Sequence, residues 1–208
     1  MKILIGDDHS VVRKGLIQIL KEAYPFAEIT EASDGAEMFK LALKNVYEII
    51  VSDITMPNRS GIDFIKELKE VQPKTPILIL SIHPAEQYAV RTIKAGASGY
   101  INKESAPEEL IIAVRQLLMG KKFITQDVAD ILFDFKGNYL NKPLHEVLSN
   151  REFEVFKLIA SGNSSVQIAT ILSLSSNTVS TYKTRLLEKM NLKNVAEITR
   201  YAMENGII

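Results

Sequence analysis

The sequence contains no cysteine, no long hydrophobic run and no excess of charge of either sign, because its formal net charge is zero. Without cysteine the chain has neither disulfides nor thiolate metal ligands, which fits a reducing cytoplasm. No apolar stretch approaches the roughly 20 residues that a membrane-spanning helix needs, and the N-terminal apolar run is too short for a signal peptide. The zero net charge argues neither for nor against a nucleic-acid partner. We therefore expect a cytoplasmic protein with no membrane partner.

The chain does contain an ordinary globular balance of 46% hydrophobic and 24% charged residues. Its 208 residues suggest one or two domains. In the first 120 residues, short apolar runs alternate with longer helical patterns, which predicts an α/β fold with a doubly wound parallel sheet. The five predicted strands cover residues 2–7, 28–32, 48–53, 76–82 and 98–102. The five predicted helices cover residues 10–23, 35–45, 60–71, 85–95 and 106–119.

After residue 120 the alternation stops, and a purely helical pattern begins near residue 148. Ser149 and Glu152 have the spacing of a capping box at the start of a first helix. Ser164 or its neighbour, Ser175 or its neighbour, and Asn194 begin three more helices. The tight turn between the second and third of them predicts a helix-turn-helix. We therefore expect a domain over residues 1–120, a linker over 121–147 with a short helix near 128–135, and a small all-α four-helix domain over 148–208.

Charged and hydroxyl side chains follow the predicted strands. Asp7 and Asp8 follow the first strand, Asp53 ends the third, Ser81 lies at the end of the fourth, and Lys103 follows the fifth. The carboxyl ends of parallel strands line one crevice, where ligands bind. Clustered carboxylates repel one another unless a hard cation such as Mg²⁺ joins them, and a lysine and a hydroxyl suit a phosphoryl group. These residues predict a site for Mg²⁺ (or Mn²⁺) and a phosphoryl group.

The same residues, in this order, resemble a two-component receiver domain, with Asp53-Ile54-Thr55-Met56-Pro57 similar to the phosphoacceptor segment. Residues 148–204 resemble a LuxR-type helix-turn-helix, through Leu148-Ser149-x-Arg151-Glu152 and Thr178-Val179. The whole chain is thus similar to a response regulator of the NarL/FixJ kind. The resemblance implies a flavodoxin-like receiver, phosphorylated by a sensor histidine kinase, that controls dimerisation and binding to promoter DNA.

The resemblance also implies roles for single residues. Asp53 would accept the phosphoryl group, which Lys103 and Ser81 would contact, and Tyr100 would take part in the switch with Ser81. Asp8 would hold the metal most directly, helped by Asp7, Asp53 and the backbone carbonyl of Thr55. Such a protein is a phosphoacceptor that assists its own phosphorylation and dephosphorylation with Mg²⁺, rather than an enzyme. It would be a homodimer when phosphorylated.

Glu104 and His83 lie close in sequence to predicted site residues. Many receivers follow the lysine with a proline, but here Glu104 follows Lys103. A cis peptide bond before a non-proline residue costs about 2.5–4 kcal/mol, and we expect a trans bond. His83, two residues after Ser81, could approach the phosphoryl group, although a solvated histidine is the simpler interpretation.

The predicted recognition helix has an inward face of Val179, Tyr182, Leu186 and Met190, spaced by three and four residues. Its hydroxyl and amide side chains can contact bases or phosphates, and its basic side chains can contact phosphates. Relatives often place lysines at the positions of Asn177 and Ser180, so a shallower salt dependence of DNA binding is expected here. The predicted DNA-contacting residues are Asn177, Ser180, Thr181, Lys183, Thr184, Arg185 and Lys189.

Two other functions remain open from the sequence. Haloacid-dehalogenase-type phosphatases also combine an Asp nucleophile, Mg²⁺ and a lysine on a doubly wound sheet. They usually carry a second acid two residues after the nucleophile, where this chain has Thr55. The other alternative is an adaptor whose C-terminal helices bind only protein, with the last helix as a packing element or a dimer contact.

Overall fold

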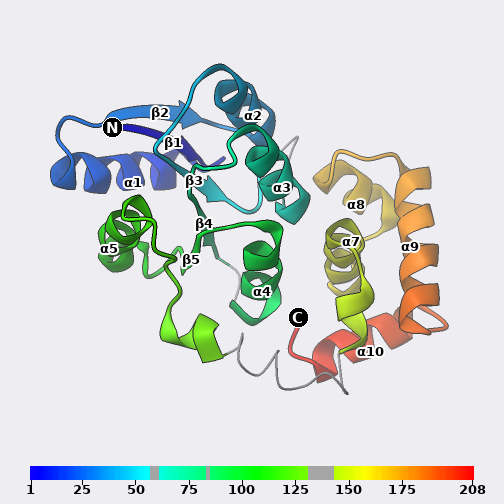
Figure 1. Ribbon diagram of the computed structural model, residues 1–208. Coiled ribbons are helices and arrows are strands. Elements are labelled where there is room, and N and C mark those ends of the chain that lie inside the picture. Colours follow the sequence, from blue (N-terminus) through cyan, green and yellow to red (C-terminus); the bar gives the residue numbers. More distant parts are fainter. Residues whose placement is uncertain (57–60, 83–84, 131–142) are drawn as a thin grey trace. The chain divides into compact units, whose positions relative to one another are not determined.

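The computed structural model describes residues 1–56, 61–82, 85–130 and 143–208 (Figure 1). The chain divides into two compact units, Met1–Gly137 and Asn138–Ile208. Among the described residues, no helix combines the length and the apolar character needed to cross a membrane.

The first unit is built on a five-stranded parallel sheet with the order β2-β1-β3-β4-β5. Its strands are β1 (Lys2–Gly6), β2 (Glu28–Ala32), β3 (Ile49–Asp53), β4 (Ile77–Ser81) and β5 (Gly99–Asn102). Its helices include α1 (Ser10–Ala23), α2 (Gly35–Lys44), α3 (Gly61–Val71), α4 (Ala85–Ala95) and α5 (Ala106–Leu118). The predicted doubly wound sheet is confirmed, and each predicted boundary lies within one residue of the observed one.

Helices cover both faces of the sheet. On one face, Ile5, Val51 and Ile101 pack with Leu16 of α1 and Leu110 of α5 in a continuous buried core. The other face is covered by α2, α3 and α4 (Figure 1). Burial on both sides explains why the central strands are continuous apolar runs rather than alternating ones. It also leaves the strand ends as the place where polar groups can gather.

The segment after α5 adds to the edge of the sheet. Phe123 forms an isolated parallel bridge with Gly99, and its side chain joins the core between the sheet and α5. A Cβ atom on Gly99 would lie 2.9 Å from the Phe123 carbonyl oxygen, so glycine permits this approach. Residues 126–130 are helical and bury Val128. The remainder of the short helix predicted near residues 128–135 lies outside the described residues.

The second unit is entirely helical among its described residues, as predicted. It consists of the 3-10 turn η1 (Leu144–Val147) and the helices α7 (Asn150–Ala160), α8 (Ser165–Ile171), α9 (Ser176–Met190) and α10 (Val195–Glu204). The side chains of Ser149, Ser164, Ser175 and Asn194 cap the four helices, each accepting a backbone N–H bond. Capping satisfies amide groups that have no partner inside the helix. The predicted helix starts are therefore confirmed.

Candidate functional site

The carboxyl edge of the sheet brings together Asp7, Asp53 and Lys103. The Nζ atom of Lys103 lies 2.7 Å from Asp53 Oδ2 and 2.7 Å from Asp7 Oδ2. The two carboxylates are almost fully buried, and the lysine side chain is only 9% exposed. Burying two carboxylates side by side is costly unless a cation compensates them. Lys103 supplies one positive charge to this pair.

Strand alternation explains why these three side chains converge. Residues two apart on a strand point to the same face of the sheet. Asp53 lies two residues after Val51, and Lys103 lies two residues after Ile101. Both apolar residues belong to the core shared with α1 and α5. Asp7 likewise lies two residues after Ile5, which belongs to the same core. The three polar side chains therefore lie on the same face of the sheet, just beyond its carboxyl edge.

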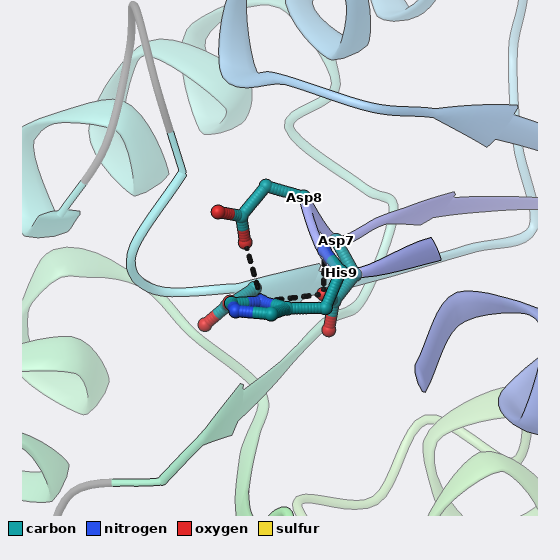
Figure 2. Close-up of side chains that lie close together, drawn as sticks. Asp7, Asp8 and His9 are labelled. Atoms are coloured by element: carbon teal, nitrogen blue, oxygen red, sulfur yellow. Dashed lines mark hydrogen bonds and ion pairs between the residues drawn. The ribbon is translucent and has the colours of Figure 1, made fainter. Parts of the chain in front are cut away.

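Asp8 and His9 extend the cluster toward solvent. The His9 Nδ1 atom lies 2.9 Å from Asp8 Oδ1 and 3.5 Å from Asp7 Oδ1. Figure 2 shows the imidazole beside the two carboxylates. Asp7, Asp8, His9 and Asp53 each offer one ligand atom, and these atoms all lie within 4.8 Å of one another. The three acids were predicted from the sequence, whereas His9 was not, and its position directly after the acidic pair was the available signal.

Arg13 is a second residue that the sequence analysis missed. It donates a hydrogen bond to the backbone carbonyl of Asp7 at 2.5 Å and another to Glu31 Oε2 at 3.0 Å. These contacts tie the turn after β1 to the end of β2. Arg13 lies one helical turn after His9, so its spacing was the only sequence signal. It positions the turn that carries the acidic pair.

Opposing effects act on the pKa values at the centre of the site. Burial raises the pKa of Asp53, and the hydrogen bond and charge of Lys103 reduce this rise without cancelling it. Burial by itself would lower the pKa of Lys103, but the hydrogen bonds and charges of Asp53 and Asp7 outweigh it and raise the pKa. The lysine therefore stays charged, and a further cation near Asp53 would favour the ionised nucleophile.

The donor set fits a hard divalent cation. Three carboxylates meet at one point, and Asp8 is partly open to water, which suits an ion that keeps several water ligands. Asp7 Oδ2 is buried and forms an ion pair with Lys103 at 2.7 Å, and the same ammonium is paired with Asp53. One positive charge thus compensates two buried carboxylates, which leaves negative charge at the site. A bound cation would compensate that charge, so the residues present fit such a group.

Thr55 lies close to the predicted nucleophile. Its backbone N–H donates to Asp53 Oδ1 at 3.1 Å, and its hydroxyl lies 3.3 Å from the same oxygen. One Asp53 oxygen is thus held by Thr55 and the other by Lys103. The predicted role of the Thr55 carbonyl in metal binding stays a prediction.

Ser81 and Tyr100 lie on the face of the sheet opposite to Lys103. The register pairs Ile79 with Tyr100, so the side chains of Ser81 and Tyr100 point to the same face. Both residues are buried. The carbonyl of Ser81 accepts the backbone N–H of Lys103 at 2.8 Å, which links the ends of β4 and β5 directly. The Lys103–Glu104 bond is trans, as predicted, whereas His83 lies outside the described residues.

Helix α9 exposes most of the predicted DNA-contacting residues. Val179, Leu186 and Met190 are fully buried, as predicted for the inward face, whereas Tyr182, the fourth residue of that face, is only half-buried. Of the predicted contact residues, Asn177, Ser180, Thr181, Thr184, Arg185 and Lys189 are exposed, and Lys183 is half-buried. The hydroxyls of Ser180, Thr181 and Thr184 donate to the carbonyl four residues earlier. Because their hydrogen atoms are used in these bonds, the hydroxyl oxygens can only accept hydrogen bonds from a partner outside the helix.

Lys189 differs from the other basic residues on α9. Its Nζ atom lies 2.7 Å from Oε2 of Glu152, a buried residue in the first turn of α7. Arg151 donates to the backbone carbonyl of Leu172 at 2.6 Å, at the end of α8. These two contacts hold α8 and α9 against the start of α7, so the helices of the predicted DNA-binding motif are fixed relative to one another.

Comparison with known proteins places both units in families. Residues 3–115 match the response regulator receiver domain family. Residues 146–202 match the family of bacterial regulatory proteins of the luxR type. Two regulatory domains leave no support for the phosphatase interpretation. The matched ranges also correspond to the two compact units of the fold.

The similarity to whole proteins extends over the full chain. The oxygen regulatory protein NreC of Staphylococcus epidermidis is 34% identical over 100% of this chain and 99% of that protein. RcsB from Salmonella enterica serovar Typhimurium, solved on the rprA promoter with the phosphomimetic BeF₃⁻, has a TM-score of 0.67 and 25% identity over 97% of each chain. A structure of two RcsB dimers on two parallel DNAs has a TM-score of 0.61 and 26% identity over 98% of each chain. The chain therefore belongs to the two-component response regulators that combine a receiver domain with a LuxR-type helix-turn-helix domain.

Proposed function

We propose that a sensor histidine kinase phosphorylates Asp53 and that this controls dimerisation and binding to promoter DNA. The observation that carries the proposal is the position of Lys103, whose Nζ lies 2.7 Å from both Asp53 and Asp7 at the carboxyl edge of the sheet. A lone Asp at a strand end is usually a turn or a cap. A buried Asp paired with a lysine and two further carboxylates is suited to receive a phosphoryl group.

In the transfer, a carboxylate oxygen of Asp53 attacks the phosphorus of a phosphohistidine. A new O–P bond forms and the P–N bond breaks, and the imidazole leaves and takes up a proton. The product on Asp53 is an acyl phosphate. Lys103 would exchange a carboxylate contact for a phosphoryl oxygen, and Ser81 would donate a hydrogen bond to another. The chain is a phosphoacceptor that also assists the loss of this group, and not a conventional enzyme.

The cation in this proposal is Mg²⁺ or Mn²⁺, held by Asp7, Asp8, Asp53 and the backbone carbonyl of Thr55. When bound, it offsets the negative charge that gathers on the transferring group. The protein's own contribution is to hold the carboxylates in place. Arg13 does this for the turn after β1, and Thr55 does it for one oxygen of Asp53.

The switch and the output follow from the same arrangement. A hydrogen bond from Ser81 to the phosphoryl group would shift a pre-existing equilibrium in which Tyr100 takes part. The output would be a homodimer that places two α9 helices on two half-sites of promoter DNA. The RcsB structures support this output, because one is a complex with a promoter and another contains two dimers bound to DNA.

We also propose how the chain is organised. The receiver would span residues 1–120, the linker 121–147 and the DNA-binding domain 148–208. Because promoter DNA is in the cytoplasm of a bacterium, we place the chain there. Within the proposed linker, Phe123 and Val128 are buried, and Phe123 pairs with Gly99 of β5.

The test is phosphorylation of the full chain by acetyl phosphate with Mg²⁺, followed by phosphate-affinity electrophoresis. Asp53→Asn should abolish the shifted band, because an amide cannot form the acyl phosphate. Asp127→Asn, at an exposed position, is the matched control and should be labelled as the wild type is. Addition of a chelator should also abolish labelling. Full labelling of the Asp53 variant would remove the proposed acceptor.

A further inference from the structure

We propose that His9 is an additional ligand of the acidic site and gives it a preference for transition-metal cations over Mg²⁺. This inference rests on the proposed metal site and goes beyond it, because the proposed carboxylate and carbonyl ligands are all oxygen atoms. The ligand class is a divalent ion that accepts nitrogen, such as Co²⁺ or Zn²⁺. The consequence is that the identity of the metal, and not only its presence, depends on this chain's own residues.

The position of His9 is set by the turn after β1. The residue precedes α1, with φ −87° and ψ 103°, and its N–H donates to Asp7 Oδ1 at 2.8 Å. This extended conformation directs the imidazole back over the acidic pair (Figure 2). No side chain caps α1 at His9, so the ring is not used for capping. The backbone thus positions the ring, and the ring faces the carboxylates.

The distances suit a shared ion. The ligand atoms of Asp7, Asp8, His9 and Asp53 lie within 4.8 Å of one another, and His9 Nδ1 is 2.9 Å from Asp8 Oδ1. Around an octahedral ion with bonds of about 2.1 Å, neighbouring ligand atoms lie about 3 Å apart and opposite ones about 4.2 Å apart. The observed separations are close to that range. The His9 side chain is 66% exposed, so it can adjust without disturbing the core.

A second observation points to an ion at this place. Asp7 Oδ1 accepts the backbone N–H of His9, whereas Asp7 Oδ2 is buried and forms an ion pair with Lys103. Lys103 is also paired with Asp53, so one ammonium compensates two buried carboxylates. A cation between Asp7, Asp8 and His9 would compensate the remaining negative charge.

The chemistry of the donor set determines the preference. Carboxylate and water oxygens suit Mg²⁺ and Mn²⁺, whereas imidazole suits the later first-row metals. An all-oxygen site would discriminate between Mg²⁺ and Co²⁺ only by the general order of affinities. A site with one imidazole adds the free energy of a metal–nitrogen bond, which Co²⁺ gains and Mg²⁺ does not. The competing possibility is that His9 is only an ion-pair partner of Asp8, with no bond to the metal.

Calorimetric titration of the full-length protein with Co²⁺ and with Mg²⁺ distinguishes these possibilities. His9→Ala should weaken Co²⁺ binding by at least about tenfold, the scale of losing a group that supports a metal, and should change Mg²⁺ binding by less than about twofold. The visible absorption of bound Co²⁺ should move to longer wavelength, because water or carboxylate is a weaker-field ligand than imidazole. Thermal unfolding without metal serves as the check on folding.

Each outcome has a separate meaning. An unchanged ratio of Co²⁺ to Mg²⁺ affinity and an unchanged Co²⁺ spectrum in His9→Ala would overturn the inference and leave the carboxylate site intact. Asp8→Asn should weaken the binding of both Co²⁺ and Mg²⁺, because it removes a proposed ligand of each ion. If Asp8→Asn changed the affinity for neither ion, the proposed site itself would be wrong. The two failures therefore have different signatures.

Discussion

Lys189 of α9 and Glu152 of α7 form an ion pair, with Nζ and Oε2 2.7 Å apart. The same Glu152 oxygen accepts hydrogen bonds from the backbone N–H and the hydroxyl of Ser149 at 2.7 and 2.8 Å. One buried carboxylate oxygen thus joins the capping box of α7 to the C-terminal part of the predicted recognition helix. Lys189 therefore has a structural partner, Glu152, although it lies on the exposed surface of α9.

Glu152→Gln should reduce the local stability of the second unit by about 2 kcal/mol, the scale of a buried hydrogen bond to a charged group. Burial would raise the pKa of Glu152, but Lys189 and Ser149 outweigh it and hold the pKa below the usual 4.5. The stabilisation is therefore complete at pH values above the usual pKa of about 4.5. It is lost as the pH falls through the lower pKa of the folded state. Hydrogen exchange of the α7 and α9 amides, at neutral and acidic pH, measures this effect.

The control for that experiment is Glu188→Gln, which changes an exposed glutamate on α9. It should leave exchange of the α7 amides unchanged. Equal protection in wild type and Glu152→Gln at neutral pH would show that the Lys189 contact contributes nothing to the stability of the folded unit.

The salt dependence of DNA binding should depend on Arg185 rather than Lys189. Arg185 is exposed on α9, whereas Lys189 is engaged with Glu152. Arg185→Ala should weaken binding to cognate and scrambled duplexes alike and flatten the slope of log K against log salt by roughly 0.9. Lys189→Ala should flatten it less and should also increase amide exchange in α9. Titrations at several salt concentrations separate the two, and a larger slope change for Lys189→Ala would reverse the assignment.

Thr184 and Ser180 should influence which sequence is bound. Their hydroxyl protons are directed to backbone carbonyls, so their lone pairs can accept from a base donor such as the amino group of adenine or cytosine. Thr184→Ala or Ser180→Ala should cost about 1–3 kcal/mol at one base position. Selection from a randomised duplex library reads out this preference. Thr199→Ala in α10, whose hydroxyl makes the same backbone contact, is the matched control and should leave the selected sequence unchanged.

Lys103→Ala should permit some phosphorylation of Asp53 but uncouple it from dimerisation. The variant keeps the acceptor and loses the ammonium that contacts both Asp53 and Asp7. It should also raise the pKa of Asp53 further, because burial already raises it and Lys103 opposes that rise. Sedimentation with and without beryllofluoride tests the coupling. A variant that dimerises as the wild type does would exclude Lys103 from the switch.

Local signals in the sequence determined the elements and most of the site. The alternation of apolar runs with helical patterns sets the sheet, and the caps at Ser149 and Asn194 set helix starts, because each depends on neighbours within a few residues. The predicted meeting of the strand-end residues needed only the rule that parallel strands share one carboxyl edge. Asp7, Asp53 and Lys103 were therefore recognisable before any distance was known.

Tertiary structure alone decided the contacts that cross between elements. Nothing near Lys189 in the sequence indicates Glu152, because the pair forms only when α9 packs against α7. His9 became a candidate ligand only through the backbone angles that turn its ring over Asp8. The sequence specifies which groups are available, whereas packing decides which of them meet, since distance and orientation depend on the whole fold.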